Sequence, residues 1–343
     1  MSPSVSILIC TRNRADHLQA TLNSLRNTHI PPLSALELIV VDNGSTDHTR
    51  KVVEAADLSF PVRYVREQRP GAANARNRAL SAAQYDILLW TDDDIRVPVH
   101  WIGPMIAPIA ENRADVVAGG VQLAPHLKRD WMAGWHYTLL ASTSYYPWEE
   151  TLHDAVGANM AFGAHVLEKV PEFDPELGPG RLGLCEESHF VERAAHHGYR
   201  VHPEPDVKVE HHFDPDRLTT PSLENALQGL GRSQAYLRYH WRHDDPVTHE
   251  SALQTWLRIV MLRAKGALKG LLHRSRADGE ALPTWRSYYV RQEAYLRQSL
   301  IERRRPQKYD RLAARPRPST AHQQPDGLLQ WVRSQLRVLK RTT

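Results

Sequence analysis

The sequence Leu88-Leu89-Trp90-Thr91-Asp92-Asp93-Asp94 places three adjacent carboxylates directly after an apolar run. The apolar part has the length and composition of a buried strand. On an extended chain Asp92 and Asp94 share one side, while Asp93 faces the other. Negative charges gathered at a buried strand end are costly unless a positive charge lies beside them. A single Asp there would be explained by helix capping or a turn, but three of them favour Mg²⁺ or Mn²⁺, which prefer hard carboxylate oxygens.

The first hundred residues alternate between β-rich apolar runs and helical patterns. The expected strands are Val5–Cys10, Leu36–Val41, Val62–Val65 and Ile87–Thr91, and the expected helices are Leu18–Leu25, Lys51–Ala56 and Ala72–Ala83. This alternation predicts an α/β fold with a mostly parallel central sheet and crossover helices. Ligands of such sheets bind at the carboxyl ends of the strands, where Thr11, Asp42 and Asp92 fall.

The pattern after residue 115 is less regular and becomes helical beyond Pro221. We expect strands at 115–121, 157–162 and 207–210, helices at 165–170 and 186–197, and a Gly- and Pro-rich loop at 175–184. Arg303–Pro325 is rich in Arg, Pro and Gln and is expected to be poorly ordered, before an amphipathic helix at 328–339. We therefore predict a catalytic domain over residues 1–220 and a helical C-terminal extension over residues 221–343.

Composition and charge are those of a globular protein whose charge is divided unevenly. The 343 residues are 41% hydrophobic and 24% charged. Residues 221–343 carry 23 Lys and Arg against 10 Asp and Glu, a net of +13, whereas residues 1–220 carry 20 against 29, a net of −9. No secretory signal pattern and no run of about 18 apolar residues is visible. With only two distant cysteines, a reduced, cytoplasmic protein is expected.

Polar groups at two strand ends suggest a pocket for a nucleotide. Thr11-Arg12-Asn13-Arg14 follows the first expected strand, and Asp42 ends the second. An Asp at such a position accepts hydrogen bonds from a nucleobase or a ribose in dinucleotide folds. The alternative is that Asp42 or Ser45 caps the following helix. The two strand ends together favour a site for a base and a diphosphate.

These segments resemble the signature of the family 2 glycosyltransferases. The resemblance rests on Val5–Arg14, Val40–Asp47, Gly71–Asn77, Leu88–Asp94, Gly157–Phe162, Glu186-Glu187, Arg193 and Gly198–Arg200, in the right order over residues 4–215. It implies the GT-A fold, a nucleotide-diphosphate-sugar donor and inversion at the anomeric carbon.

The resemblance also implies roles for individual residues. The residues expected to bind the donor are Thr11, Arg12, Arg14, Asp42, Arg76, Asp92 and Asp93. Asp94 is expected to bind the metal, Mg²⁺ or Mn²⁺. His211 or His212 resembles a late histidine that reaches the metal or the diphosphate in relatives. The alternative for two adjacent histidines is an ordinary turn at a strand end.

Glu186 and Glu187 are the candidates for the base that removes a proton from the acceptor hydroxyl. Family members usually have Glu-Asp here, so strict alignment selects Glu187, and the change to Glu-Glu leaves Glu186 open. A carboxylate in a first helical turn is favoured as an anion by the helix dipole. That effect alone also explains a Glu at either position.

The acceptor side is less sharply marked. The loop Gly178–Gly183 either closes over the ligands or simply connects two elements. The aromatic residues from Trp131 to Trp148 either stack on an acceptor sugar or pack in the core. The residues predicted to contact the acceptor are Asn159, Gly180, Trp131 and Trp135.

Two basic amphipathic stretches in the extension, Trp256–His273 and Leu328–Lys340, are typical of helices that lie on an anionic membrane. This would suit a lipid-linked saccharide acceptor and a peripheral position at the inner face of the membrane. The alternatives are packing against the catalytic domain or a dimer interface. No module that reads nucleic acid is recognisable, so nucleic-acid binding is not expected.

The sequence thus predicts an inverting, metal-dependent glycosyltransferase that acts on a hydroxyl acceptor. A metal-dependent nucleotidyltransferase is the second candidate, but the Gly-rich phosphate loop of those enzymes is absent around Cys10–Arg14. A non-catalytic carbohydrate-binding protein is the third. The intact acidic pairs argue against this last class.

Overall fold

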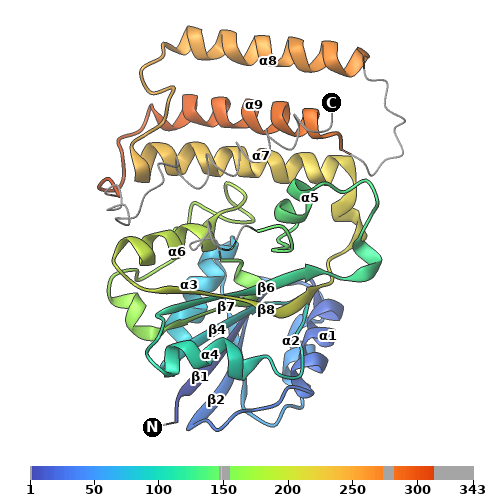
Figure 1. Ribbon diagram of the computed structural model, residues 1–343, viewed down its shortest axis with the longest axis vertical. Helices are drawn as coiled ribbons and strands as arrows, with labels where there is room; N and C mark the ends of the chain where they lie inside the picture. The colour runs from blue at the N-terminus through green and yellow to red at the C-terminus, as the bar shows by residue number, and fades with distance from the viewer. Residues whose placement is uncertain (1, 147, 149–154, 273–281, 313–343) are drawn as a thin grey trace.

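The structure is a computed structural model that describes residues 2–146, 148, 155–272 and 282–312. One sheet of eight strands, in the order β3-β2-β1-β4-β7-β6-β8-β5, forms the centre of the molecule. Helices cover both faces of the sheet, and three long helices, α7, α9 and α8, are stacked beyond it (Figure 1). This confirms the expected α/β class with a helical C-terminal region.

The first half of the chain follows the predicted alternation closely. Its elements are β1 Ser4–Thr11, α1 Ala15–Arg26, β2 Ala35–Asp42, α2 Thr49–Glu54, β3 Val62–Arg66, α3 Ala72–Ala82 and β4 Ile87–Asp92. Strands β3, β2, β1 and β4 are parallel neighbours. Their carboxyl ends therefore meet at one edge of the sheet, as expected for a ligand site.

The second half differs from the sequence-based expectation in several elements. It contains β5 Ile95–Arg96, α4 Ile102–Ala110, β6 Val116–Leu123, α5 Gly134–Leu139, β7 Met160–Gly163, α6 Glu186–His196 and β8 Val201–His211. The helix expected at 165–170 is a 3₁₀-helix over Ala164–Glu168, and β8 is longer than predicted. We did not predict β5, α4 or α5. Helix α4 contains one Gly and two Pro in nine residues, which hides its helical pattern.

Three antiparallel pairings complete a mixed sheet. Strand β7 is antiparallel to both β4 and β6, while β6 and β8 are parallel. The short strand β5 pairs with the end of β8, so that Ile95 lies opposite His211. This pairing brings a residue from position 211 next to the aspartates that follow β4.

The sheet is buried on both faces, as the near-continuous apolar strands require. Val5, Ile7 and Ile9 of β1 face a core shared with α1, α2 and α4. Leu8 faces the opposite core, which includes Trp90 and the helices α3 and α6. The two cores fix the strand ends from both sides.

The C-terminal helices are α7 Thr220–Leu237, α8 Ala252–Leu272 and α9 Thr284–Glu302, with a π-helical turn at Arg238–Arg242. Helix α7 packs against α9, and α9 packs against α8 (Figure 1). An apolar cluster joins α7 to the end of the sheet through Leu123, Phe213, Leu223 and Leu227. The predicted boundary at residue 220 coincides with the start of α7, and its status as a domain boundary stays a prediction.

The expected disorder from Arg303 onward is wrong for the residues up to Leu312, because Tyr309 stacks on Trp241 with ring centroids 3.7 Å apart. The remainder of that segment and the helix predicted at 328–339 lie outside the described residues. Within the described ranges, no helix is long and apolar enough to cross a membrane.

The loop before α6 packs tightly on α7 at Gly183. A Cβ atom there would lie 2.3 Å from Gly229 Cα, and Gly183 has φ +139°. Gly198 also has a positive φ, of +88°, but no atom lies within 4 Å of its added Cβ. We expect Gly198→Ala to lower the free energy of unfolding by about 1 kcal/mol, and Gly183→Ala by more than about 3 kcal/mol. Urea denaturation of both variants tests this, and equal losses would contradict the packing described.

Candidate active site

The three aspartates after β4 lie in a buried, charge-balanced corner at the strand ends. The Arg14 guanidinium donates to Asp93 Oδ1 at 3.1 Å and to Asp94 Oδ2 at 2.7 Å. Asp93 Oδ2 also accepts a hydrogen bond from Thr11 Oγ1 at 2.7 Å. Arg14 and Thr11, both predicted donor-pocket residues, therefore hold two of the aspartates at the end of β1.

Asp94 and His211 are close enough to share a ligand. His211 Nε2 lies 3.3 Å from Asp94 Oδ2, and both side chains are buried. His211 Nδ1 lies 3.0 Å from the carbonyl oxygen of Leu140. Only a protonated Nδ1 can donate to a carbonyl, so in a neutral imidazole the lone pair is on Nε2, the side of Asp94. A histidine whose other ring nitrogen donates to a backbone carbonyl is typical of metal sites.

A carboxylate and an oriented imidazole together fit a divalent cation. Among the residues that the structure describes, no three His, Cys, Asp or Glu side chains are gathered as a complete metal cage. Two protein ligands are sufficient for Mg²⁺ or Mn²⁺ where water and phosphate oxygens supply the others. The side chain of His212 instead lies with Glu210, Nε2 to Oε2 at 3.1 Å. The structure thus separates the two histidines, and the metal role predicted for His212 stays a prediction.

Arg217 is a member of this corner that the sequence did not single out. Its Nη1 lies 3.9 Å from Asp94 Oδ2 and 3.4 Å from His211 Nε2. It reaches the corner from a 3₁₀-helix at Pro215–Leu218, and its guanidinium lies over the ring of Phe213. A basic residue six positions after His211 was the only sequence signal for it. It adds a second positive charge beside Asp94 Oδ2, the oxygen that Arg14 also contacts.

The positive neighbours set the ionisation of the aspartates. Burial alone would raise the pKa of Asp94, but protonated His211, together with Arg14 and Arg217, lowers it. Burial and the nearby Asp94 charge raise the pKa of Asp93 to about 6, against the opposing effect of Arg14. Asp94 is therefore the carboxylate that the surrounding charges keep ionised.

A second charged group lies on the other side of the β4 end and centres on Arg76 of α3. Arg76 Nη2 donates to Glu187 Oε1 at 2.6 Å and lies 3.4 Å from Asp92 Oδ1. Its Nε is 3.9 Å from Glu186 Oε1. Gly157 makes room for this contact, because a Cβ there would lie 2.4 Å from Arg76 Nη2 and 2.5 Å from Glu187 Oε1. One buried guanidinium thus links Asp92 to both candidate bases.

The two glutamates at the start of α6 have different surroundings. The Glu186 side chain is 3% exposed and the Glu187 side chain is 18% exposed. Burial, followed by the charge of Glu187, raises the pKa of Glu186 well above its usual value. A Cβ at Gly178 would lie 2.7 Å from the Glu186 carboxyl carbon, so the loop closes over this side chain. Glu187 is the one whose carboxylate reaches solvent-accessible space.

Asp42, at the end of β2, makes more hydrogen bonds within the protein than expected. Asp42 accepts hydrogen bonds from Ser45 N at 2.7 Å and from Tyr64 Oη at 2.6 Å. Burial and the bond to Asp42 raise the pKa of Tyr64 to about 12. The bond from Ser45 N supports the turn-stabilising alternative for Asp42, and its donor contact stays a prediction. Arg12, by contrast, is exposed beside this edge.

The predicted acceptor residues occupy structural positions. Asn159 is buried, and its amide donates to the carbonyls of Gly120 and Val207 and accepts from Trp101 Nε1 at 2.9 Å. Trp135 is buried and stacks on His136 with centroids 3.5 Å apart. Trp131 is half-buried at the margin of the same cluster. These surroundings favour the alternative that the aromatic residues pack in the core. The contact of Asn159, Trp131 and Trp135 with an acceptor stays a prediction.

Gly180 belongs to the loop before α6, which packs between the start of α3 and α7. A Cβ at Gly180 would lie 3.2 Å from Gly71 Cα, and Ala72 N donates to Pro179 O at 3.0 Å. On the other side, Arg232 Nε of α7 donates to Leu182 O at 3.0 Å. The loop therefore forms one wall beside Glu186, held from α3 and from α7.

The helical extension also anchors helix α6, a role that the sequence did not reveal. Asp174 Oδ2 accepts hydrogen bonds from Tyr236 Oη at 2.9 Å and Trp241 Nε1 at 2.8 Å. Arg242 Nη2 donates to Glu192 Oε2 of α6 at 2.8 Å, and His189 Nδ1 lies 3.4 Å from the same oxygen. The Arg242 contact joins α6, which carries both candidate bases, to the π-helical turn after α7, and the Asp174 contacts join the segment before α6 to α7 and to that turn.

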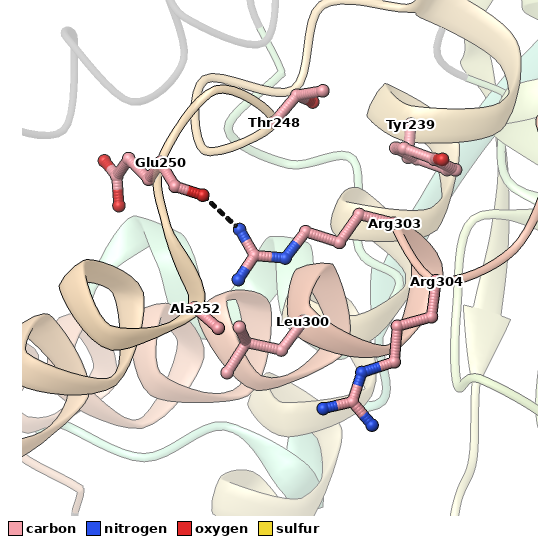
Figure 2. Close-up of a pocket in the computed structure, with 7 residues that line it drawn as sticks. All are labelled: Tyr239, Thr248, Glu250, Ala252, Leu300, Arg303 and Arg304. Atoms are coloured by element: carbon pink, nitrogen blue, oxygen red, sulfur yellow. Dashed lines mark hydrogen bonds between the residues drawn. The ribbon is translucent and has the colours of Figure 1, made fainter.

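A separate hollow lies away from these residues, where the end of α9 meets the segment before α8 (Figure 2). It is lined by Tyr239, Thr248, Glu250, Ala252, Leu300, Arg303 and Arg304. Arg303 Nη1 donates to the backbone carbonyl of Glu250 at 2.7 Å. The hollow therefore contains a structural contact and none of the predicted site residues.

The mixed sheet with helices on both faces has the arrangement of the GT-A fold. Residues 6–170 match the family model described as glycosyl transferase family 2. Glycosyltransferase AglE from Haloferax volcanii is 28% identical over 122 residues, which are 35% of this chain and 40% of AglE. The match spans less than half the length of that curated relative.

Two solved structures share the fold. The mannosyltransferase PcManGT from Pyrobaculum calidifontis, in complex with GDP-Man and Mn²⁺, has a TM-score of 0.56 and 19% identity, over 88% of this chain and 87% of the other. Residues 1–349 of TarS from S. aureus, in complex with UDP-GlcNAc, have a TM-score of 0.51 and 18% identity, over 88% and 92%. At such identities the likeness establishes the fold alone.

The stability that the Glu192–Arg242 contact of α6 contributes should depend on pH. Burial opposes ionisation of Glu192, but His189 and Arg242 lower its pKa from 4.5 to about 2. A lowered pKa in the folded state stabilises the protein above pH 4.5, and this contribution is lost as the pH falls toward 2. We expect Glu192→Gln to lower the free energy of unfolding by about 2 kcal/mol at pH 7. Denaturation curves at several pH values should show the difference from wild type shrinking below pH 4.5, and a constant difference would contradict this.

Proposed function

We propose that this protein is an inverting, metal-dependent glycosyltransferase that moves a sugar from a nucleotide-diphosphate-sugar donor to a hydroxyl acceptor. The observation that carries the proposal is the arrangement of two charged groups around one strand end. Asp94 lies with His211 and Arg217 on one side, and Asp92 lies with Arg76 and Glu187 on the other. The first group suits a diphosphate with its cation, and the second suits proton removal.

Asp94 and His211 would hold the cation, Mg²⁺ or Mn²⁺. When bound, such a cation neutralises the charge that develops on the departing nucleoside diphosphate. Arg14 and Arg217 are the cations of the chain beside the same position. The structures of PcManGT with GDP-Man and Mn²⁺ and of TarS with UDP-GlcNAc support a nucleotide sugar as the donor class.

Glu187 would act as the general base. Its carboxylate takes the proton of the acceptor hydroxyl as the acceptor oxygen bonds to the anomeric carbon and the bond from that carbon to the diphosphate oxygen breaks. Arg76 holds Oε1 of Glu187 through a 2.6 Å hydrogen bond, which fixes the orientation of the carboxylate. Helix α6 presents Glu187 from its first turn, where the helix dipole favours an anion.

The acceptor would be a saccharide, a lipid-linked saccharide or a small molecule with a free hydroxyl. A cytoplasmic location is part of the proposal, and the free thiols of Cys10 and Cys185 are compatible with it. A nucleotidyltransferase would release pyrophosphate rather than a nucleoside diphosphate. Product analysis after incubation with UDP- and GDP-sugars therefore separates the two classes.

Replacement of Asp94 tests the cation site. Asp94→Asn keeps the shape of the side chain but removes the charge, so Mn²⁺-dependent binding of UDP or GDP should weaken at least about tenfold. The exposed Asp57→Asn serves as the matched control. Isothermal titration with and without Mn²⁺ measures the effect. If both variants bind the nucleotide with wild-type affinity, Asp94 is not a metal ligand.

Replacement of each glutamate separately tests the base. Glu187→Gln should lower kcat by about 10²- to 10⁴-fold while donor binding stays unchanged, because the amide cannot accept the proton. Glu186→Gln should keep most of the transfer activity, since that carboxyl is buried beneath the loop. Release of nucleoside diphosphate in the presence of an acceptor is the measurement. The reverse result would assign the base to Glu186.

A further inference from the structure

Helix α8 presents a continuous apolar stripe away from the body of the protein. Its large exposed apolar residues are Leu253, Trp256, Leu257, Val260, Met261, Leu268 and Leu271. They recur at the three- and four-residue spacing of one helix face. The opposite face carries the buried Thr255 and Ile259, and it packs on α9. Helix α8 is the outermost of the stacked helices (Figure 1), so the stripe is directed away from the sheet.

The charges on α8 are all positive. The helix contains Arg258, Arg263, Lys265 and Lys269, and its sequence ALQTWLRIVMLRAKGALKGLL has no Asp or Glu. Lys265, in the middle of the helix, is exposed. The surrounding segment has the same sign, since residues 221–343 carry a net charge of +13. Arg258 pairs with Glu250 and Arg263 pairs with Glu293, both outside the helix. An apolar stripe on a helix whose own charged residues are all basic matches a surface that is apolar in depth and anionic at its head groups.

The stripe is held in a fixed orientation by its neighbours. Arg303, at the end of α9, donates to the carbonyl oxygen of Glu250 directly before α8 (Figure 2). It also donates to the carbonyl oxygen of Val247 in the same segment. Arg263 Nε donates to Glu293 Oε1 of α9 at 2.8 Å. The apolar face is therefore preformed and needs no rearrangement to be presented.

We propose that α8 is an interfacial helix that docks this protein on a membrane containing anionic lipids. The aliphatic residues and Trp256 would enter the acyl boundary, while the exposed Lys265 faces lipid phosphates. A second copy of the chain is disfavoured as the occupant, because two such helices would bring like charges together. The chain's own residues 313–343 are disfavoured for the same reason, since they carry six Lys and Arg against one Asp.

Vesicle flotation of the full chain tests the proposal. The probes are vesicles of phosphatidylcholine alone and vesicles that also contain phosphatidylglycerol. Met261→Glu is compared with Val99→Glu, because both side chains are 53% exposed and Val99 lies in the segment between β5 and α4. Wild type and Val99→Glu should float with the anionic vesicles, and Met261→Glu should partition at least about tenfold less. Lys265→Glu and added salt should also reduce binding, since both weaken attraction to anionic lipid.

Equal flotation of Met261→Glu and Val99→Glu would overturn the proposal, as would failure of the wild type to bind anionic vesicles. Light scattering that shows a dimer dissociated by Met261→Glu, without vesicle binding, would assign the face to a second copy instead. Thermal denaturation of each variant shows whether it is folded. This inference does not depend on the proposed transfer reaction, because vesicle binding is measured without donor or acceptor.

Discussion

The buried negative charges at the end of β4 have to be balanced by positive side chains, and the rest of the structure depends on this balance. Glu186 and Glu187 lie beside the three aspartates of residues 92–94, so five carboxylates are close together. Buried carboxylates of this density are unstable without positive partners. Arg14, Arg76 and Arg217 supply these partners from a loop, a helix and a 3₁₀-helix that are distant in sequence.

The strand pairings of the sheet bring these charged residues together. The parallel strands deliver Thr11 and Asp92 to one edge, and the antiparallel pairing of β5 with β8 adds His211. Helix α6 then brings the two glutamates, and its far side is tied to the helical extension through Glu192 and Arg242. The C-terminal helical region therefore supports the candidate site through the turn after α7. It also contains α8, whose outer face is apolar.

The sequence predicted the first half of the chain well because its signals are local. Apolar strands of β-branched residues and an Ala-rich helix have clear periods, and polar residues at their ends marked the site edge. Helix α4 was missed because Gly and Pro obscure its pattern. Arg217, Asp174 and Tyr64 were missed because their partners are 22 to 123 residues away or are defined only by packing.

The proposed preference for Glu187 over Glu186, and for His211 over His212, rests on features that only the structure provides. Adjacent residues have the same chemistry in sequence, and only burial and direction separate them. Asn159 illustrates the converse, because the structure shows a polar residue of a family motif making three hydrogen bonds in the core.

Anomalous diffraction at the manganese edge, from crystals soaked with Mn²⁺ and a nucleoside diphosphate, tests the central claim most directly. We expect an anomalous peak within bonding distance of the Asp94 carboxylate and His211 Nε2. A bound nucleotide without a peak at these side chains, and with Arg14 still spanning Asp93 and Asp94, would contradict it.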